Sequence, residues 1–232
     1  MELRKLQLTS NELKLIALVS MTIDHIGYFL LPKYKLLRIL GRIAFPIFAY
    51  MIAEGCRHTS NRLRYFLGIL GLGILVQLLF WYTRQSLYQH ILITFSMSIA
   101  LIFSLRQAAE KGGVWFLVSG LALALAGFVC LLLKNYLPIR GFSVDYGLCG
   151  VLLPVLIYAA QTRTQRLLAA AIGLTAVSIS FTNSIQWFSL LALPLLALYN
   201  GQRGSYRLKY LFYAYYPLPL LILESIRVTN GR

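Results

Sequence analysis

Charge is scarce in this chain, and negative charge is the scarcest. Only 12% of the 232 residues are charged, and 7 Asp and Glu stand against 22 Lys and Arg, for a net charge of +15. A soluble domain carries about 25% charged residues. With 59% hydrophobic residues and a mean hydropathy of +0.70, this shortage argues against a soluble protein.

Cysteine and histidine are equally few, with three of each. Cys56, Cys130 and Cys149 lie in or at the ends of apolar runs and lack the spacing of metal ligands. We therefore expect neither a disulfide framework nor a metal site. The chain also lacks a glycine-rich phosphate loop, a common signature of nucleotide binding.

The chain consists instead of long apolar runs separated by short basic breaks. We predict an all-α fold, a polytopic integral membrane helical bundle with about nine transmembrane helices. Residues 1–232 are expected to form a single transmembrane domain, without a cleavable signal peptide. The predicted spans are 13–31, 35–56, 64–83, 90–106, 113–134, 144–161, 166–182, 185–200 and 207–226.

The basic residues lie mostly in the breaks between these spans. There they set membrane topology and meet anionic lipid headgroups, so we expect lipids and not nucleic acid as partners. With the N-terminus in the cytosol, 13 Lys and Arg fall on the inner side and 8 on the outer side. This balance predicts a cytosolic N-terminus and an external C-terminus.

Titratable residues lie inside the first two predicted spans, where they are costly and usually functional. Asp24 and His25 are in the first span and Arg42 is in the second, all roughly 10 Å below the outer boundary. Successive helical residues point ~100° apart, so we expect Asp24 to pair with Arg42 and to leave His25 available for chemistry. The alternative is an Asp–Arg pair that merely joins two helices.

Several stretches resemble one family over most of the chain. LKLIALVSMTIDHIG (13–27), RILGRIAFPIFAYMIAEGCRHT (38–59), VDYGLCGVLLPVLIY (144–158), LYNGQRG (198–204) and KYLFYAYYPLPLLIL (209–223) resemble the TraX family. These are conjugation-associated membrane proteins, named for the acetylase of F-type pilin. The spacing from Lys14 to His25 also resembles the basic-x10-His signature of membrane acyltransferases that modify cell-envelope sugars.

The resemblance implies an acetyltransferase of the bacterial inner membrane that uses cytosolic acetyl-CoA and no metal. The acceptor would be an amine or hydroxyl of a pilin, an envelope glycan or a lipid. His25 would be the catalytic base, with Asp24, Arg42 and Glu54 as polar motif residues. The chain departs from the pattern at Pro219, where a His is expected, and at QHILITF (89–95), which matches only loosely.

Acyl transfer needs a base, a group that stabilises the oxyanion and a site for the donor phosphates. His25 suits the first role and Arg42 the second. For the phosphates we predict Lys14, three turns before His25 on the same helix face, with Arg57, Arg62 and Arg64 at the inner side. The motif residue Glu54 is expected in the same donor site. The alternative for Lys14 is an ordinary snorkelling lysine.

The acceptor is expected to approach from the outer side or laterally from the bilayer. Each residue at the outer end can also be read as part of a solvated loop. Asp145, His90 and Tyr146 are our predicted contacts, and Tyr88, Arg140, Asn183 and Gln186 share that end. Two other functions stay open. A small proton-coupled transporter would use Asp24, His25 and Arg42 as a relay. A non-catalytic assembly factor of a pilus or secretion machine would need no base.

Overall fold

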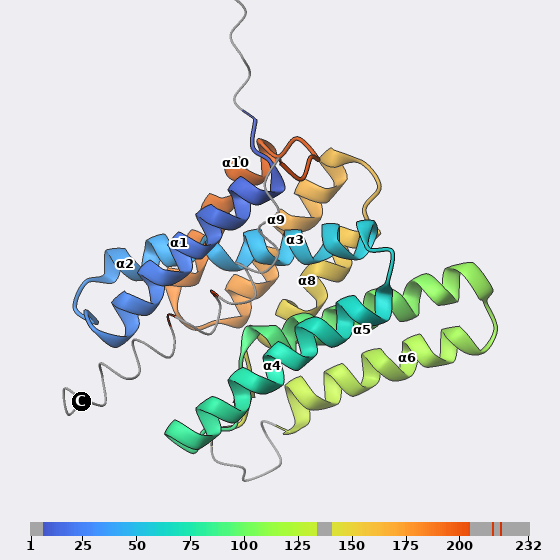
Figure 1. Cartoon of the computed structure of the whole chain (residues 1–232), viewed down its shortest axis with the longest axis horizontal. Coiled ribbons are helices and arrows are strands. Elements are labelled where there is room, and N and C mark those ends of the chain that lie inside the picture. Colours follow the sequence, from blue (N-terminus) through green and yellow to red (C-terminus); the bar gives the residue numbers. More distant parts are fainter. Residues whose placement is uncertain (1–6, 134–140, 205–214, 216–218, 220–232) are drawn as a thin grey trace, which may run out of the picture. The chain divides into compact units, whose positions relative to one another are not determined.

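The computed structural model describes residues 7–133, 141–204, 215 and 219, most of them helical (Figure 1). The chain divides into two compact units. Unit 1 comprises Met1–Met51 and Ser178–Arg232, and unit 2 comprises Ile52–Val177.

Unit 1 opens with α1 (Ser10–Phe29), whose start is set by a capping box. The Thr9 hydroxyl accepts from the Glu12 amide, and the Glu12 carboxylate accepts from the Thr9 amide at 2.7 Å. This bond from the Thr9 backbone lowers the pKa of Glu12. Both reciprocal bonds satisfy amides that a helix start leaves without partners, so they define where α1 begins.

The predicted second span is two helices in the structure. α2 (Lys35–Gly41) packs against α1, and α3 (Ala44–His58) follows after a turn at Arg42 and Ile43. Gly41 is buried where α2 meets α1, and a side chain there would overlap Asp24. The close approach of the two helices therefore depends on the missing Cβ.

The later part of unit 1 is a 3-10 helix, η2 (Ser184–Leu191), which continues into α10 (Ala192–Ala197). Eight residues form an unusually long 3-10 run. The chain then returns to the start of α1, where the Leu8 amide donates to Leu198 O and the Ser10 amide donates to Gln202 O, both at 2.8 Å. The LYNGQRG stretch is thus anchored to the first turn of α1.

Unit 2 is built around α5 (Ile91–Lys111), which packs against α4 (Arg62–Arg84), α6 (Val114–Gly127) and α8 (Gly147–Ala159). A π-helical turn, η1 (Phe128–Leu132), extends α6, and most of α9 (Arg163–Ser180) belongs to this unit. Two short strands, β1 (Tyr88–Gln89) and β2 (Ser143–Val144), pair in parallel.

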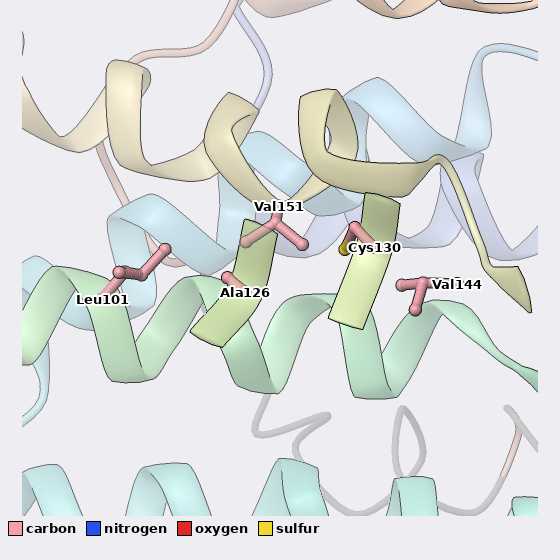
Figure 2. Close-up of a cluster of buried hydrophobic side chains, with 5 residues drawn as sticks. All are labelled: Leu101, Ala126, Cys130, Val144 and Val151. Atoms are coloured by element: carbon pink, nitrogen blue, oxygen red, sulfur yellow. The ribbon is translucent and has the colours of Figure 1, made fainter. Parts of the chain in front are cut away.

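The core of unit 2 is a cluster of small and branched apolar side chains. Leu101, Ala126, Cys130, Val144 and Val151 come from five different elements and meet in one buried group (Figure 2). α5 is also linked to α8 by a buried hydrogen bond, in which the Ser98 hydroxyl donates to Val151 O at 2.7 Å. Satisfying this hydroxyl removes the cost of burying it in an apolar core.

The predicted fold class, an all-α membrane protein, is confirmed. Four described helical segments are long and apolar enough to cross a membrane, at Lys35–His58, Arg62–Arg84, Ile91–Lys111 and Val114–Leu132. The predicted count of about nine spans is not confirmed by the described residues. α8, the predicted span 144–161, has 13 residues and so is only ~20 Å long. The predicted span 207–226 lies almost wholly outside the described residues.

Gly41→Ala should destabilise the protein, because the new methyl group would collide with the Asp24 side chain. Overpacking of this kind costs about 1–3 kcal/mol. The matched control is Gly120→Ala on α6, where nothing lies within 4 Å of the added carbon and helix propensity improves. Thermal unfolding in detergent should show a lower Tm for Gly41→Ala alone. Equal Tm values would contradict the close packing of α1 on α2.

Candidate functional site

The polar centre of unit 1 is Asp24, which is bound by two arginines. Arg38 Nη1 lies 2.6 Å from Oδ2, and Arg42 Nη2 lies 2.5 Å from Oδ1. The Asp24 and Arg42 side chains are each only 14% exposed. Charge-assisted bonds of this geometry are strong, and they leave the group with one net positive charge.

The sequence explains why these groups meet. Arg38 and Arg42 are one helical turn apart, and Arg42 Nε donates to Arg38 O at 3.2 Å. The predicted pairing of Asp24 with Arg42 is therefore confirmed. The role of Arg38 was missed, because its position near the end of a span made it look like a topology signal. The i, i+4 spacing to Arg42 was the signal that could have identified it.

Gln186 of η2 joins this group. Arg42 Nη1 donates to Gln186 Oε1 at 3.3 Å, and the Ser178 hydroxyl donates to Gln186 O at the same distance. Gln186 was predicted at the outer end, as a possible acceptor contact or as part of a solvated loop, and the structure shows that it is buried. The 3-10 conformation turns it inward, which a helical or loop reading of this stretch could not indicate.

His25 follows Asp24 on α1 and takes no part in the arginine contacts given above. Its Nδ1 is buried and has no hydrogen-bond partner among the described residues. The ring lies beside Phe29, with 6.1 Å between the ring centroids. Its role as a base stays a prediction.

The residues predicted to hold the donor fall into both units. Lys14 belongs to α1 in unit 1, whereas Glu54, Arg57, Arg62 and Arg64 belong to unit 2. The buried Glu54 carboxylate lies 3.0 Å from Arg166 Nη1 and 3.7 Å from Arg57 Nη1. Arg166 was not among the predicted residues, although it completes this group.

Arg57 also closes the end of α8. Its Nη2 lies 2.7 Å from Ile157 O, 2.5 Å from Tyr158 O and 2.8 Å from Ala160 O. A helix leaves its last carbonyls without intrahelical partners, and a cation there is favourable. Arg57 thus has a structural role that its position in a basic loop did not indicate.

Arg62 and Arg64 differ from each other in their surroundings. Arg62 Nη2 lies 3.1 Å from Glu110 Oε1, a carboxylate that also binds Arg106. The Arg64 amide donates to the Asn61 side chain, which caps α4, while the Arg64 side chain is exposed. Of the predicted arginines, Arg64 is therefore the one best placed to meet a ligand from solution.

The predicted acceptor residues of unit 2 come together around the two short strands. Tyr88 Oη donates to Asp145 Oδ1 at 2.6 Å, and the Asp145 amide donates to Gln89 O at 2.9 Å. The His90 ring packs on Phe80 and Tyr88, and Tyr146 has a left-handed conformation (φ 59°) just before α8. These residues form an ordered group and not a solvated loop, while Arg140 lies outside the described residues.

A family model described as TraX protein matches residues 9–227. The chain belongs to the TraX family. The resemblance found in the sequence motifs is thereby confirmed, and with the apolar helices it makes this TraX chain a membrane protein.

Two curated proteins are similar to this TraX chain. A probable fimbrial assembly protein, FimC of serogroup H1, from Dichelobacter nodosus is 25% identical over 97% of this chain and 98% of its own length. An uncharacterized protein of Rickettsia prowazekii (strain Madrid E) is 33% identical over 41% of this chain and 37% of its own length. No solved structure matches.

Asp24→Asn should destabilise this TraX protein, because it leaves two partly buried arginines without their carboxylate. Breaking a fully buried ion pair on one side costs about 3–5 kcal/mol, which is an upper bound here because Arg38 is 27% exposed. Glu110→Gln is the matched control, since it breaks two arginine contacts at a site that is 42% exposed, where solvent screens ion pairs and they add little stability. Thermal unfolding of the two variants measures the difference. A similar Tm for both would show that the Asp24 group does not hold unit 1 together.

Proposed function

We propose that this TraX protein is an integral membrane acetyltransferase of the bacterial inner membrane. It would transfer the acetyl group of cytosolic acetyl-CoA to an amine or hydroxyl of a pilin, an envelope glycan or a lipid. The observation that carries the proposal is the buried Nδ1 of His25, which has no hydrogen-bond partner in the described part of the chain and lies beside the arginine-bound Asp24.

The free-energy cost of burying Asp24 and His25 in an apolar helix supports a functional role for them. Ionisable groups in an apolar helix are expensive and mostly mark ligand or proton pathways. Buried side-chain nitrogens nearly always have a hydrogen-bond partner, so an exception calls for a reason. Asp24 is already satisfied by Arg38 and Arg42, and the neighbouring His25 is the group left over for a substrate.

Histidine is suited to the proton transfer that acetyl transfer requires, because its unperturbed pKa is near neutral. In the proposed reaction, His25 takes the proton of the acceptor N–H or O–H as that atom attacks the thioester carbonyl carbon. The tetrahedral intermediate then collapses, the carbon–sulfur bond breaks and the proton passes to the CoA thiolate. Asp24 and Arg38 hold the helices in place, and Arg42 adds positive potential for the oxyanion.

The proposed cytosolic N-terminus makes the donor approach from the side of Lys14 and Arg64. The larger count of Lys and Arg on that side supports the orientation. Arg57 is held by α8 carbonyls and Arg62 by Glu110, so Arg64 is our proposed phosphate contact in unit 2. Lys14 is proposed separately, as a phosphate contact in unit 1. Asp145, His90 and Tyr146 are proposed as acceptor contacts.

The similarity to a probable fimbrial assembly protein favours a pilus as the setting. An acetyltransferase that modifies pilin fits that setting. So does a second candidate, an assembly factor without catalysis, in which the Asp24 group only joins helices. The two functions differ in one measurable respect, since only the enzyme releases CoASH from acetyl-CoA.

His25→Ala should lower kcat for acetyl transfer roughly 10²–10⁴-fold in the purified protein, because the proton acceptor is lost. Added imidazole should restore part of the rate. Ile26→Ala is the control, since it removes a side chain from the same helical turn without removing a titratable group. The assay follows CoASH release with envelope extract as acceptor. A fully active His25→Ala protein would exclude His25 as the base.

Lys14→Ala and Arg64→Ala should each raise KM for acetyl-CoA more than they lower kcat. One charge-assisted bond to a phosphate contributes about 1.5–3 kcal/mol, which corresponds to a roughly 10- to 100-fold weaker donor complex. Lys33→Ala, an exposed lysine in the predicted outer loop, is the matched control. If Lys33→Ala alone weakens donor binding, both the donor site and the proposed orientation are wrong.

A further inference from the structure

η2 presents two buried polar side chains on one face. A 3-10 helix has three residues per turn, so Gln186 and Ser189 lie directly above one another. Gln186 is 3% exposed and Ser189 is fully buried. Neither Gln186 Nε2 nor Ser189 Oγ has a hydrogen-bond partner in the part of the chain that the structure describes.

The Gln186 amide has a defined orientation. A guanidinium can only donate hydrogen bonds, so the contact with Arg42 Nη1 requires Oε1 on that side and directs Nε2 elsewhere. The backbone is held as well, because Ser178 donates to Gln186 O and the Asn183 side chain caps the start of η2. The amide therefore cannot exchange its ends without losing the arginine contact.

The two orphan groups define the chemistry of a partner. Nε2 of an amide only donates, so the partner atom must be an acceptor, and the Ser189 hydroxyl can supply a second donor. A carbonyl oxygen has two lone pairs and can accept from both. Because the adjacent Arg42 and Arg38 outweigh the single charge of Asp24, the surroundings also favour an oxygen that becomes negative.

We propose that Gln186 Nε2 and Ser189 Oγ bind the carbonyl oxygen of the acyl thioester. This inference rests on the proposed acetyltransferase function. When the acceptor atom attacks the carbonyl carbon, the C=O π electrons move to the oxygen, and both donors stabilise the resulting oxyanion. The electrons return as the carbon–sulfur bond breaks and CoA leaves as thiolate, which takes the acceptor proton by way of His25.

A pair of CoA compounds tests carbonyl binding without turnover. S-acetonyl-CoA has a ketone oxygen and S-propyl-CoA does not, although their shapes are similar. The full chain in nanodiscs should bind the ketone about 10-fold more tightly. Ser189→Ala and Gln186→Glu, which keeps the oxygen for Arg42 but removes the donor, should bring the ratio toward one. Trp187→Phe, at an exposed position of the same helix, should leave it unchanged.

The kinetics and the thermal stability of the same variants provide two further measurements. With acetyl-CoA, each of the two subsite variants should lower kcat on the order of 10²-fold at nearly constant KM. Ser189→Ala should keep or raise Tm, because it removes a buried hydroxyl that has no partner among the residues that the structure describes. A Tm lowered by several degrees would show an internal structural role and overturn the assignment.

The outcomes separate the two proposals. If both CoA compounds bind wild type equally and the variants change nothing, the carbonyl subsite is wrong while use of a CoA donor stands. If neither compound binds and no CoASH is released, the acetyltransferase function fails and the subsite fails with it.

Discussion

The carboxylate of Asp24, held between Arg38 and Arg42, is the interaction on which unit 1 depends. It joins α1 to α2 and to the turn that follows, and through Arg42 it reaches Gln186 of η2. In apolar surroundings, two arginines without this carboxylate would be expensive to bury. The Asp24 group therefore holds α1, α2 and η2 in one arrangement, although η2 is far from the others in the sequence. Both oxygens of the carboxylate already have arginine partners, so neighbouring residues are the candidates for binding a substrate.

The buried polar groups of unit 1 differ in whether they have hydrogen-bond or ion-pair partners. The arginines and the aspartate have partners, whereas single atoms of His25, Gln186 and Ser189 have none among the described residues. Fully satisfied polar networks make a structure rigid, and unsatisfied donors and acceptors are where a ligand gains most. In unit 2 the buried Glu54 carboxylate binds Arg166 and Arg57, and Arg57 also closes the end of α8, while Arg166 Nε has no hydrogen-bond partner among the described residues. Both units therefore combine a satisfied carboxylate with single buried atoms that lack a partner in the described part of the chain.

The fold class and part of the candidate site could be predicted from the sequence, and the features that could not be predicted have physical causes. Hydropathy and helical geometry were enough for the fold class and for the Asp24–Arg42 pair, because both follow from local periodicity. The break at Arg42 and Ile43 and the 3-10 form of Ser184–Leu191 could not be predicted, since hydropathy does not register how a helix winds. The contacts of Arg38, Arg166 and Gln186 were missed for a different reason. Arg38 and Arg166 lie near span ends, where a basic residue is read as a topology signal, and the inward orientation of Gln186 depends on the 3-10 winding of η2.

The 3-10 winding of η2 affects how far this segment can reach across a bilayer. A 3-10 helix rises ~2.0 Å per residue and an α-helix ~1.5 Å, so the eight residues of η2 and the six of α10 extend ~25 Å in place of ~21 Å. The hydrocarbon core of a bilayer is ~30 Å thick. Because of the 3-10 winding, this 14-residue apolar segment is only about one helical turn shorter than the hydrocarbon core is thick. The same stretch that aligns Gln186 with Ser189 also lengthens the segment that carries them.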